Sequence, residues 1–480
     1  MPNFSVAADR GRAALLASLS TAVGAELMVA PEATAKYDVD WTGDHSGRAL
    51  AVVRPRDVDQ VAAVVRWCRE HRVPLVPQGG NTGLVAGATP SEDGGEVVVS
   101  LELMKAIRQI DALNGVAIVE AGCVLDDFKA AVSKVGAFFP LSIGSQGTCQ
   151  IGGTISTNAG GINVVRYGMA RSFVMGLEVV LPDGQILRDL RGLHKNNTGY
   201  DLKQLFIGAE GTLGIITAAA LKIQPSLSRV ETMFVATASV PETIALFHRM
   251  RQDAGDLITA FELMLSTSVR RVCATEEGVY DPFSTAYPAY AIVEMSSCGG
   301  PPLRAWLETY LAGLMEEGLL LDGVIAQSSA QAANIWRLRE GIVESQARLG
   351  AYLRTDVSTP ISAVAEFIAR GTDLVEALVP GAQVHPYGHV GDGNLHFNVI
   401  RPEAMTPESF KPQIKRIEEA LFELVDDLGG SISAEHGIGV AKRAAFQRRV
   451  GDVPRDLMLK LKKVFDPDNI MNPGRILCER

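Results

Sequence analysis

Cysteine, positive charge and long apolar runs are all scarce in this chain of 480 residues. The six cysteines are scattered and form no CxxC pair, which argues against a zinc finger or a disulfide framework and favours reduced thiols. The formal net charge of -10 argues against a nucleic-acid partner, because binding phosphates requires a basic surface. No segment approaches the roughly 20 apolar residues of a membrane span, and residues 1–16 lack a signal-peptide core. We therefore expect a soluble, cytoplasmic protein with no transmembrane segment.

Glycine, in contrast, is concentrated in two long stretches, residues 77–88 and 140–161, and in a shorter one at 205–216. The first is neither GxxxxGK[ST] nor a GxGxxG that opens a helix, so neither a P-loop nor a nicotinamide-binding fingerprint is supported. Glycines let backbone N–H groups surround an anion and let the backbone lie flat against a planar ligand. One such loop alone could be a simple turn cluster. Two of them, one about twenty residues long, favour a long phosphate-bearing cofactor.

Hydrophobic patterning predicts a βαβ unit over residues 50–77, with a helix at 57–70 and a capping box formed by Asp57 and Gln60. Such a unit usually implies parallel strands. Beyond residue 230, strand-like runs alternate with longer helical stretches, and we place a domain boundary just after Pro225. The expected organisation is a first domain at 1–225, a second domain at 226–450, and a C-terminal segment at 451–480 that returns to the first domain. The longer helices are expected at 241–253, 302–318 and 330–349.

Four motifs occur together: PQGGNTGLVAGA, GTCQIGGTISTNAGG, GAEGTLGIIT and DNIMNPGRIL. In combination they resemble the vanillyl-alcohol oxidase type of flavoprotein over most of the chain. Within that superfamily the chain is similar to the FAD-linked D-2-hydroxyacid dehydrogenases, which include D-lactate and D-2-hydroxyglutarate dehydrogenases. The resemblance implies an α+β fold: an FAD-binding domain of two α/β subdomains, and an α+β substrate domain with an antiparallel sheet. It also implies non-covalent FAD, because the first glycine loop has no histidine to attach a flavin.

The resemblance further assigns residues to FAD. The pyrophosphate would lie on the first glycine loop, and the second loop would line the adenosine and flavin side. Ile215 would lie near the adenine half, and Asn472 would reach the isoalloxazine ring. The implied cofactor-binding residues are Pro77, Gly79, Gly80, Asn81, Thr82, Gly83, Ser142, Gly152, Gly153, Ser156, Thr157, Asn158, Gly161, Ile215 and Asn472.

Two of the eight histidines flank an Asp-Gly pair in YGHVGDGNLHFN, residues 387–398. Asp-Gly between apolar or aromatic strands predicts a two-residue hairpin turn, here at Asp392 and Gly393. That register places His389 directly opposite His396, with Cβ atoms about 4.5–5.5 Å apart, and puts Asn398 on the same face. Two imidazoles at this spacing can share a metal ion.

A metal site needs a third ligand, and SAEHGIGVAKR at 433–443 provides Glu435 beside His436. Adjacent ionisable residues before a Gly-x-Gly turn are typical of a functional loop. A His2Glu set suits zinc, which we expect, although manganese or iron could use it too. Histidines are more often hydrogen-bonded core or surface residues than ligands, and we interpret His385 in this way. For His389, His396 and Glu435, the resemblance implies metal binding.

A metal ion and a flavin suggest how a 2-hydroxyacid would be oxidised, with the ion polarising the hydroxyl and His436 accepting its proton. The resemblance places the carboxylate anchor at Arg339, whose planar fork suits a carboxylate, and adds Asn398, Arg354 and Val343 to the substrate site. Arg337 is interpreted as solvent-facing.

The substrate and the electron acceptor stay open at this point. Arg354 and Val343 replace a lysine and a threonine of 2-hydroxyglutarate enzymes, so D-lactate and D-malate remain alternatives to D-2-hydroxyglutarate. A zinc hydrolase and a flavin-binding electron-transfer subunit without turnover are the competing functions. The expected partners are a small 2-hydroxyacid, an acceptor such as an electron-transfer flavoprotein or quinone, and a second copy in a homodimer.

Overall fold

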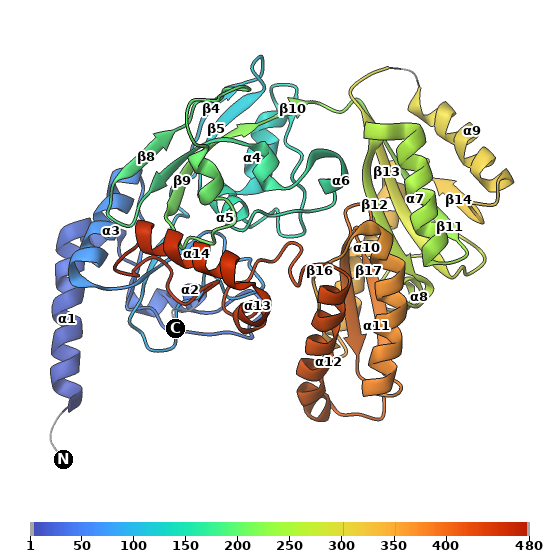
Figure 1. Ribbon diagram of the computed structural model, residues 1–480. Coiled ribbons are helices and arrows are strands. Elements are labelled where there is room, and N and C mark those ends of the chain that lie inside the picture. The colour runs from blue at the N-terminus through green and yellow to red at the C-terminus, as the bar shows by residue number, and fades with distance from the viewer. Residues whose placement is uncertain (1–3, 301, 351, 478–480) are drawn as a thin grey trace.

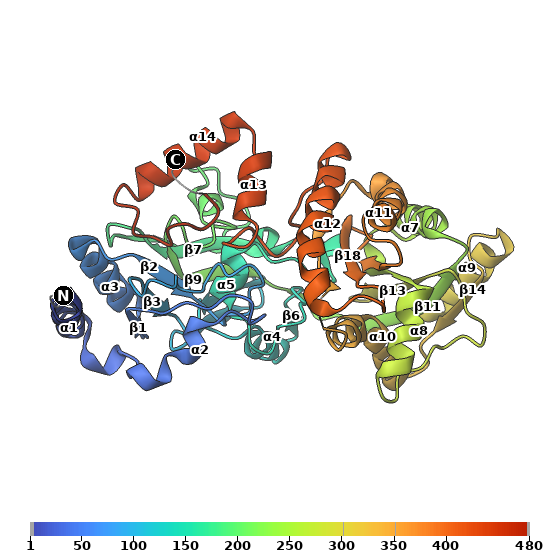
Figure 2. The same ribbon diagram turned by 90° about the horizontal axis from the view of Figure 1, so that it is seen from below.

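Four β-sheets divide the chain into two lobes, which the computed structural model describes for residues 4–300, 302–350 and 352–477 (Figures 1 and 2). The first lobe starts with α1 (Phe4–Val23) and α2 (Ala35–Asp38) and contains a three-stranded parallel sheet. Its strands, in spatial order, are β1 (Ala51–Val53), β3 (Val97–Ser100) and β2 (Leu75–Gln78). The βαβ prediction is confirmed, since α3 (Val58–His71) links β1 to β2 and Asp57 accepts a hydrogen bond from the Gln60 amide.

The second sheet of this lobe is antiparallel and five-stranded, and a small two-stranded sheet lies beside it. The five strands are β4 (Ile107–Asp111), β5 (Val116–Glu120), β9 (Ile215–Lys222), β7 (Val174–Val180) and β8 (Ile186–Asp189). The small sheet pairs β6 (Ala137–Phe138) with β10 (Gln224–Pro225). The connecting helices are α4 (Leu125–Ser133), α5 (Ile151–Ser156) and α6 (Val164–Tyr167).

The second lobe is built on an antiparallel sheet in the order β14-β11-β13-β12-β17-β18-β15, with β16 also paired to β18. Its strands are β11 (Arg229–Thr237), β12 (Ile258–Leu265), β13 (Ala289–Ser297), β14 (Asp322–Ile325), β15 (Tyr352–Leu353), β16 (Val357–Ser358), β17 (Gln383–Gly388) and β18 (Asn394–Ile400). Its helices are α7 (Val240–Ala254), α8 (Ser266–Thr275), α9 (Leu303–Glu316), α10 (Ser329–Ala347), α11 (Val364–Leu378) and α12 (Pro407–Asp427). The three longer helices expected from the sequence correspond to α7, α9 and α10.

The C-terminal segment lies against the first lobe (Figure 2). After α13 (Arg443–Arg449) and α14 (Asp452–Phe465), Met471 forms a parallel bridge with Leu75 of β2. The predicted α+β class is therefore confirmed. Among the described residues, five cysteines are free thiols, and Cys478 lies outside the described residues. No helix in the described ranges combines the length and apolarity needed to cross a bilayer.

Candidate functional site

The turn that carries the two histidines differs from the predicted one. Tyr387, and not His389, is the cross-strand partner of His396, and the connection between β17 and β18 spans residues 389–393. The chain turns at His389, whose carbonyl accepts hydrogen bonds from the amides of Asp392 and Asn394. The predicted two-residue turn is wrong because β17 already ends at Gly388, whose φ is 142°, and residues 389–393 connect it to β18.

The two imidazoles nevertheless meet. Their ring centroids lie 6.0 Å apart, and the candidate ligand atoms of His389, His396 and Glu435 all lie within 4.8 Å of one another. Nδ1 of His396 lies 3.3 Å from the Thr355 carbonyl oxygen, and Nε2 of His389 lies 3.9 Å from Glu435 Oε2. The three side chains predicted as metal ligands are thus brought together, although by a different loop geometry.

Glu262, which the sequence analysis did not single out, completes this group. Its carboxylate is fully buried, and Oε1 contacts His389 Nδ1 while Oε2 lies 2.7 Å from Arg339 Nε. The available signal was one acidic residue inside the apolar strand ITAFELML. Burial alone would raise the pKa of Glu262, but His389 and Arg339 lower it to about 2.

The pKa shifts of the acidic and histidine side chains in this group favour a bound cation. Burial raises the pKa of Glu435 to about 7 and that of Asp392 to about 6, because both carboxyl groups lack a sufficient positive neighbour. Burial lowers the pKa of His396 to about 3. For His389 burial also acts downward, but Glu262 outweighs it and raises the pKa to about 9. A divalent ion would supply the positive charge that the carboxylates lack, and it would replace a proton on the His389 imidazole.

His436 stands beside this group and is held by Asp356. The backbone amides of Glu435 and His436 donate to Asp356 Oδ2 at 3.0 and 2.9 Å, and His436 Nδ1 lies 3.5 Å from the same oxygen. Lys442 and Asn394 also contact this buried carboxylate. Burial lowers the pKa of His436, although Asp356 opposes the shift, which favours a neutral imidazole that can accept a proton.

Arg339 lies close to the histidines, and part of its guanidinium group makes no hydrogen bond to any residue that the structure describes. The side chain is 12% exposed, and the guanidinium carbon lies 4.6 Å from the centroid of the Tyr387 ring. Its Nε is bonded to Glu262, and among the described residues its two terminal nitrogens make no hydrogen bond. A substrate carboxylate could accept hydrogen bonds from both of them.

The other predicted substrate residues are placed differently. Asn398 is 2% exposed, and its amide nitrogen donates to Gln346 at 2.6 Å and to the Tyr387 hydroxyl at 3.4 Å. Arg354 pairs with Asp44 of the first lobe at 3.2 Å. Val343 follows Arg339 by one turn of α10 and exposes 42% of its surface.

The glycine loops of the first lobe converge, although they are far apart in sequence. A Cβ added to Gly79 would lie 3.6 Å from the amide nitrogen of Gly153, and one on Gly80 would lie 2.2 Å from the Thr148 carbonyl oxygen. Gly211 packs in the same way against Pro77. The approach at Gly80 leaves no room for a side chain, that at Gly79 is an ordinary van der Waals contact, and Gly83 and Gly153 face open space.

The remaining predicted FAD residues lie on or beside these loops. Asn81 and Asn158 adopt positive φ angles, and the Asn81 amide donates to the Val39 carbonyl. Gly152 approaches Ala121, and Gly161 approaches the Ser142 carbonyl. Thr82 precedes Gly83, Ser156 accepts from the Glu210 amide, and the Thr157 hydroxyl donates to the Gly153 carbonyl.

Ile215 and Asn472 are both buried. Ile215 is 1% exposed within the core, so any contact with a cofactor would involve its backbone. The side-chain amide nitrogen of Asn472 donates to the carbonyls of Gly87 and Glu210. Its side-chain oxygen, Oδ1, is buried without a partner among the described residues. Gln150 Oε1 is likewise buried and unpaired beside Gly79. Tight loops with unpaired polar atoms fit a large polar ligand such as FAD.

The two parts of the site meet at Gly160. A Cβ on this glycine would lie 2.7 Å from Glu435 Oε1, so the second glycine loop touches the candidate metal group directly. Elsewhere the lobes are joined by Glu210, which accepts hydrogen bonds from the amides of Ile438 and Gly439 at 2.7 and 2.8 Å. The candidate metal group and the glycine loops therefore form one site between the lobes.

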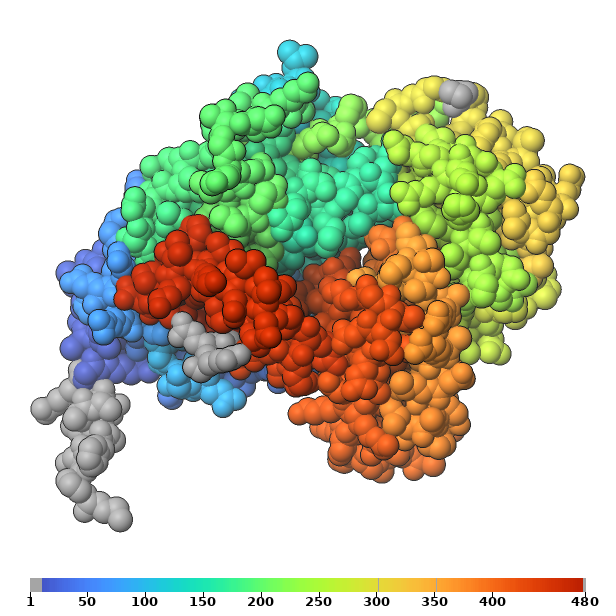
Figure 3. Space-filling model, viewed as in Figure 1, coloured from blue at the N-terminus to red at the C-terminus, as the bar shows by residue number. Residues whose placement is uncertain are grey.

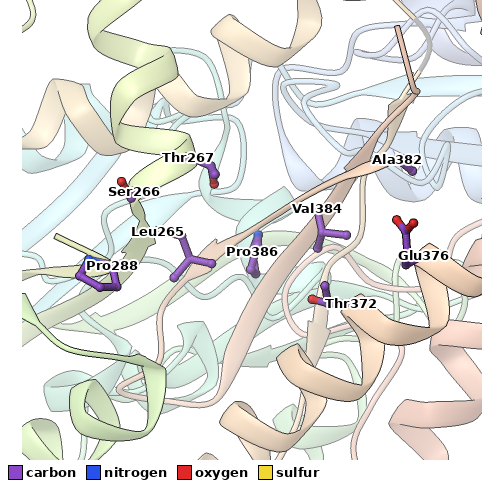
Figure 4. A pocket seen from close by; sticks show the side chains of 9 residues that line it. All are labelled: Leu265, Ser266, Thr267, Pro288, Thr372, Glu376, Ala382, Val384 and Pro386. Carbon is purple, nitrogen blue, oxygen red and sulfur yellow. The ribbon is translucent and has the colours of Figure 1, made fainter. Parts of the chain in front are cut away.

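A cavity of about 270 Å³ elsewhere in the second lobe is not this site (Figure 4). It lies where β12 and β17 separate, against α11, and is lined by Leu265, Thr372, Val384 and Pro386 among others. Side chains alternate along a strand, so Val384 and Pro386 point away from the face that carries Tyr387 and the histidine group. Its lining contains none of the predicted site residues.

Comparison with known proteins agrees with the geometry. Residues 49–189 match the family described as FAD binding domain, and residues 227–476 match that of FAD linked oxidases, C-terminal domain. The chain belongs to the FAD-linked oxidase family. It is 39% identical to a probable D-2-hydroxyglutarate dehydrogenase of rice (Oryza sativa subsp. indica), over 92% of this chain and 77% of the relative. Identity to the D-2-hydroxyglutarate dehydrogenase of Stutzerimonas stutzeri is 38%, over 92% of this chain and 94% of the relative.

Solved structures show the same fold. The structure of p-cresol methylhydroxylase matches with a TM-score of 0.77, covering 98% of this chain and 97% of that one at 17% identity. A 4-ethylphenol oxidase from Gulosibacter chungangensis matches with a TM-score of 0.72, covering 98% of each chain at 17% identity. The vanillyl-alcohol-oxidase-type fold and the resemblance to D-2-hydroxyacid dehydrogenases are confirmed. This member of the FAD-linked oxidase family is an FAD-dependent oxidoreductase.

Proposed function

We propose that this FAD-linked oxidase oxidises a D-2-hydroxyacid to the 2-oxoacid, with D-2-hydroxyglutarate as the first substrate to test. The observation that carries the proposal is the meeting of three chemical groups: a His2Glu ligand set, an adjacent neutral histidine, and an arginine whose two terminal nitrogens make no hydrogen bond within the described residues. Names of relatives at 35–39% identity point to the same substrate.

Two cofactors would complete the site. FAD, held non-covalently by the converging glycine loops, supplies a hydride acceptor when bound. A divalent metal, zinc in our proposal, would be held by His389, His396 and Glu435, and would polarise the substrate hydroxyl when bound.

The chain itself would bind the acid and receive the proton. Arg339 would donate two hydrogen bonds to the C1 carboxylate through its terminal nitrogens. The hydroxyl proton would go to His436 while the C2 hydrogen leaves with its electron pair for the flavin, so that the C2–O bond becomes a carbonyl. Asp356 would keep His436 in place throughout.

The choice among D-2-hydroxyacids rests on the second carboxylate. Arg354, which exposes 47% of its side chain and pairs only weakly with exposed Asp44, is a candidate for binding it. Val343 offers no hydrogen bond there. D-lactate and D-malate remain the alternative substrates.

The partners and the location are part of the proposal. We expect an electron acceptor such as an electron-transfer flavoprotein or a quinone, and a homodimer. The names of plant and animal relatives include the word mitochondrial, whereas that of the Stutzerimonas stutzeri protein gives no location. We retain the cytoplasm as the proposed location.

The decisive test is anaerobic reduction of the bound flavin by a panel of D- and L-2-hydroxyacids, with and without a chelator. D-2-hydroxyglutarate should bleach the flavin absorbance, the L-enantiomer should not, and the chelator should slow the reaction. Flavin that no member of the panel reduces would contradict the proposal and favour a subunit without turnover. A purified protein lacking flavin absorbance would instead favour a zinc hydrolase.

A further inference from the structure

One buried carboxylate touches both halves of the proposed substrate site. Glu262 lies on β12, and the pairing of Leu263 with Gly388 puts it at the register position opposite His389. Its Oε1 contacts His389 Nδ1 and its Oε2 lies 2.7 Å from Arg339 Nε. A single side chain thus connects a proposed metal ligand to the proposed carboxylate anchor.

Glu262 is fully buried, and a charge in that position costs several kcal/mol unless it is paired. Here its two oxygens have different partners, and each contact fixes the orientation of a functional group. The contact with Nδ1 of His389 selects the tautomer whose Nε2 is free and directs it toward Glu435. The contact with Nε of Arg339 leaves the two terminal nitrogens for a ligand.

We propose that Glu262 is a positioning residue that sets the metal ligand and the substrate anchor relative to each other. This inference rests on the proposed function. Glutamine has nearly the same shape, but its amide has one acceptor oxygen, so Glu262→Gln cannot accept from both His389 and Arg339. One of the two contacts must be lost, and with it either metal affinity or substrate affinity.

The test uses the FAD-loaded protein and needs no turnover. Zinc affinity is measured by competition with a chelating dye, and binding of 2-oxoglutarate is measured by the change in flavin absorbance. Glu262→Gln should weaken zinc binding about 10- to 100-fold, or weaken 2-oxoglutarate binding at saturating zinc by a similar factor, with FAD content unchanged. If that variant does not fold, Glu262→Asp keeps the charge but is one methylene too short to reach both partners, and should show the same losses.

The control is Glu294→Gln, which removes a partly buried strand carboxylate on β13 and should leave zinc and 2-oxoglutarate binding unchanged. Wild-type affinities in both Glu262 variants would overturn the inference, as would equal losses in Glu294→Gln. Failure of the proposed function looks different, because then wild-type flavin is not reduced by any 2-hydroxyacid, whatever the Glu262 variants do to zinc.

A separate observation concerns α14, which lies on the surface of the first lobe (Figure 3). Val453, Leu457, Leu461 and Val464 follow one another at helical spacing, and expose 71%, 55%, 38% and 77% of their surfaces. Such an apolar stripe on a helix usually meets a partner. Its face turned to the first lobe is anchored by Lys462, which donates to the carbonyls of Thr212 and Met471.

The charges along this stripe favour a second copy of the same chain. Asp456, Lys460 and Lys463 lie on one flank of the stripe, and within the described residues none of them forms an ion pair. In an antiparallel pair of α14 helices related by a two-fold axis, Val453 faces Val464 and Asp456 faces Lys460 of the other copy.

We infer that the protein forms a homodimer through antiparallel α14 helices. One helical stripe is smaller than the roughly 800 Å² per partner of standard interfaces, so the dimer should be concentration-dependent. Sedimentation of the holoenzyme over about 1 to 100 μM should show association. Lys460→Glu should abolish it, because two acidic side chains then meet, and the double variant Asp456→Lys with Lys460→Glu should restore it.

A wild-type protein that stays monomeric at the highest concentration would overturn this inference. So would a dimer that Lys460→Glu leaves intact. If the protein is monomeric and Leu457→Asp slows reoxidation of the reduced flavin by an electron carrier, the stripe binds that carrier instead, which also contradicts the dimer. Flavin reduction by substrate serves as the control for folding of every variant.

Discussion

Arg339 and Arg337 lie two residues apart on α10 but in opposite environments, which makes them a matched pair. Arg339 is 12% exposed beside the histidines, whereas Arg337 is exposed and donates to the Glu277 carbonyl. Losing charged hydrogen bonds to a carboxylate costs roughly 1.5–3 kcal/mol. Arg339→Ala should therefore lower kcat/KM for the hydroxyacid about 10- to 100-fold. Steady-state kinetics should show no such loss for Arg337→Ala, and an unchanged Arg339→Ala would remove Arg339 from the substrate site.

His389 and His385 provide a second matched pair of a proposed ligand and a control, since both belong to the segment around β17. His389→Ala removes a proposed ligand and should abolish zinc binding and flavin reduction by substrate, while FAD stays bound to the first lobe. His385 is buried against Ser268, and His385→Gln should keep the metal. Metal analysis and flavin absorbance of both variants provide the measurement. Loss of FAD from His389→Ala would show that the two cofactor sites are not separate.

At the scale of single strands, Glu294 of β13 is a partly buried acid that forms no ion pair with any residue the structure describes. Burial raises its pKa, with hydrogen bonds from Thr259 and Trp336 opposing the shift. A carboxyl whose pKa is higher in the folded than in the unfolded protein destabilises the fold once the pH exceeds its unfolded pKa. Glu294→Gln should therefore raise the free energy of unfolding by about 0.5–2 kcal/mol at pH 8.

That gain should shrink as the pH falls through the raised pKa of Glu294, because the wild-type carboxyl is then protonated. Urea unfolding at pH 8 and pH 5 measures the difference. Glu423→Gln on the exposed face of α12 is the control and should change stability by less than about 0.5 kcal/mol at either pH. A pH-independent effect of Glu294→Gln would contradict the assignment.

The elements also show what the sequence can and cannot predict. Helix α3 and its cap at Asp57 follow from local periodicity and side-chain chemistry, and both were predicted correctly. The hairpin at His389 was not, because the preference of Asp-Gly for a short turn is local, whereas tertiary contacts fix Gly388 and Gly393. A Cβ on Gly393 would lie 2.2 Å from the Thr359 carbonyl. Glu262 was missed for the same reason, because its role depends on its contact with His389, which is distant in sequence.

At the scale of the whole molecule, the site exists only because two lobes meet. The predicted ligands and the first two glycine loops are separated by more than two hundred residues of sequence, and only family resemblance could place them together. The contact at Gly160 was not anticipated, since a glycine in a glycine-rich loop gives no signal of its own. The structure explains it by the 2.7 Å approach of a virtual Cβ to Glu435 Oε1.

This contact predicts that the two cofactor sites communicate. Gly160 does not have a positive φ, so alanine is compatible with its backbone, and the added methyl group would collide with the end of a flexible glutamate. Gly160→Ala should therefore fold and keep FAD, but should displace Glu435 and weaken zinc binding by about tenfold or more. Gly144→Ala in the same loop is the control, because nothing lies within 4 Å of its Cβ position. Zinc affinity is measured by dye competition in both variants. Equal affinities would mean that the second glycine loop does not constrain Glu435, and that this loop contacts the flavin alone.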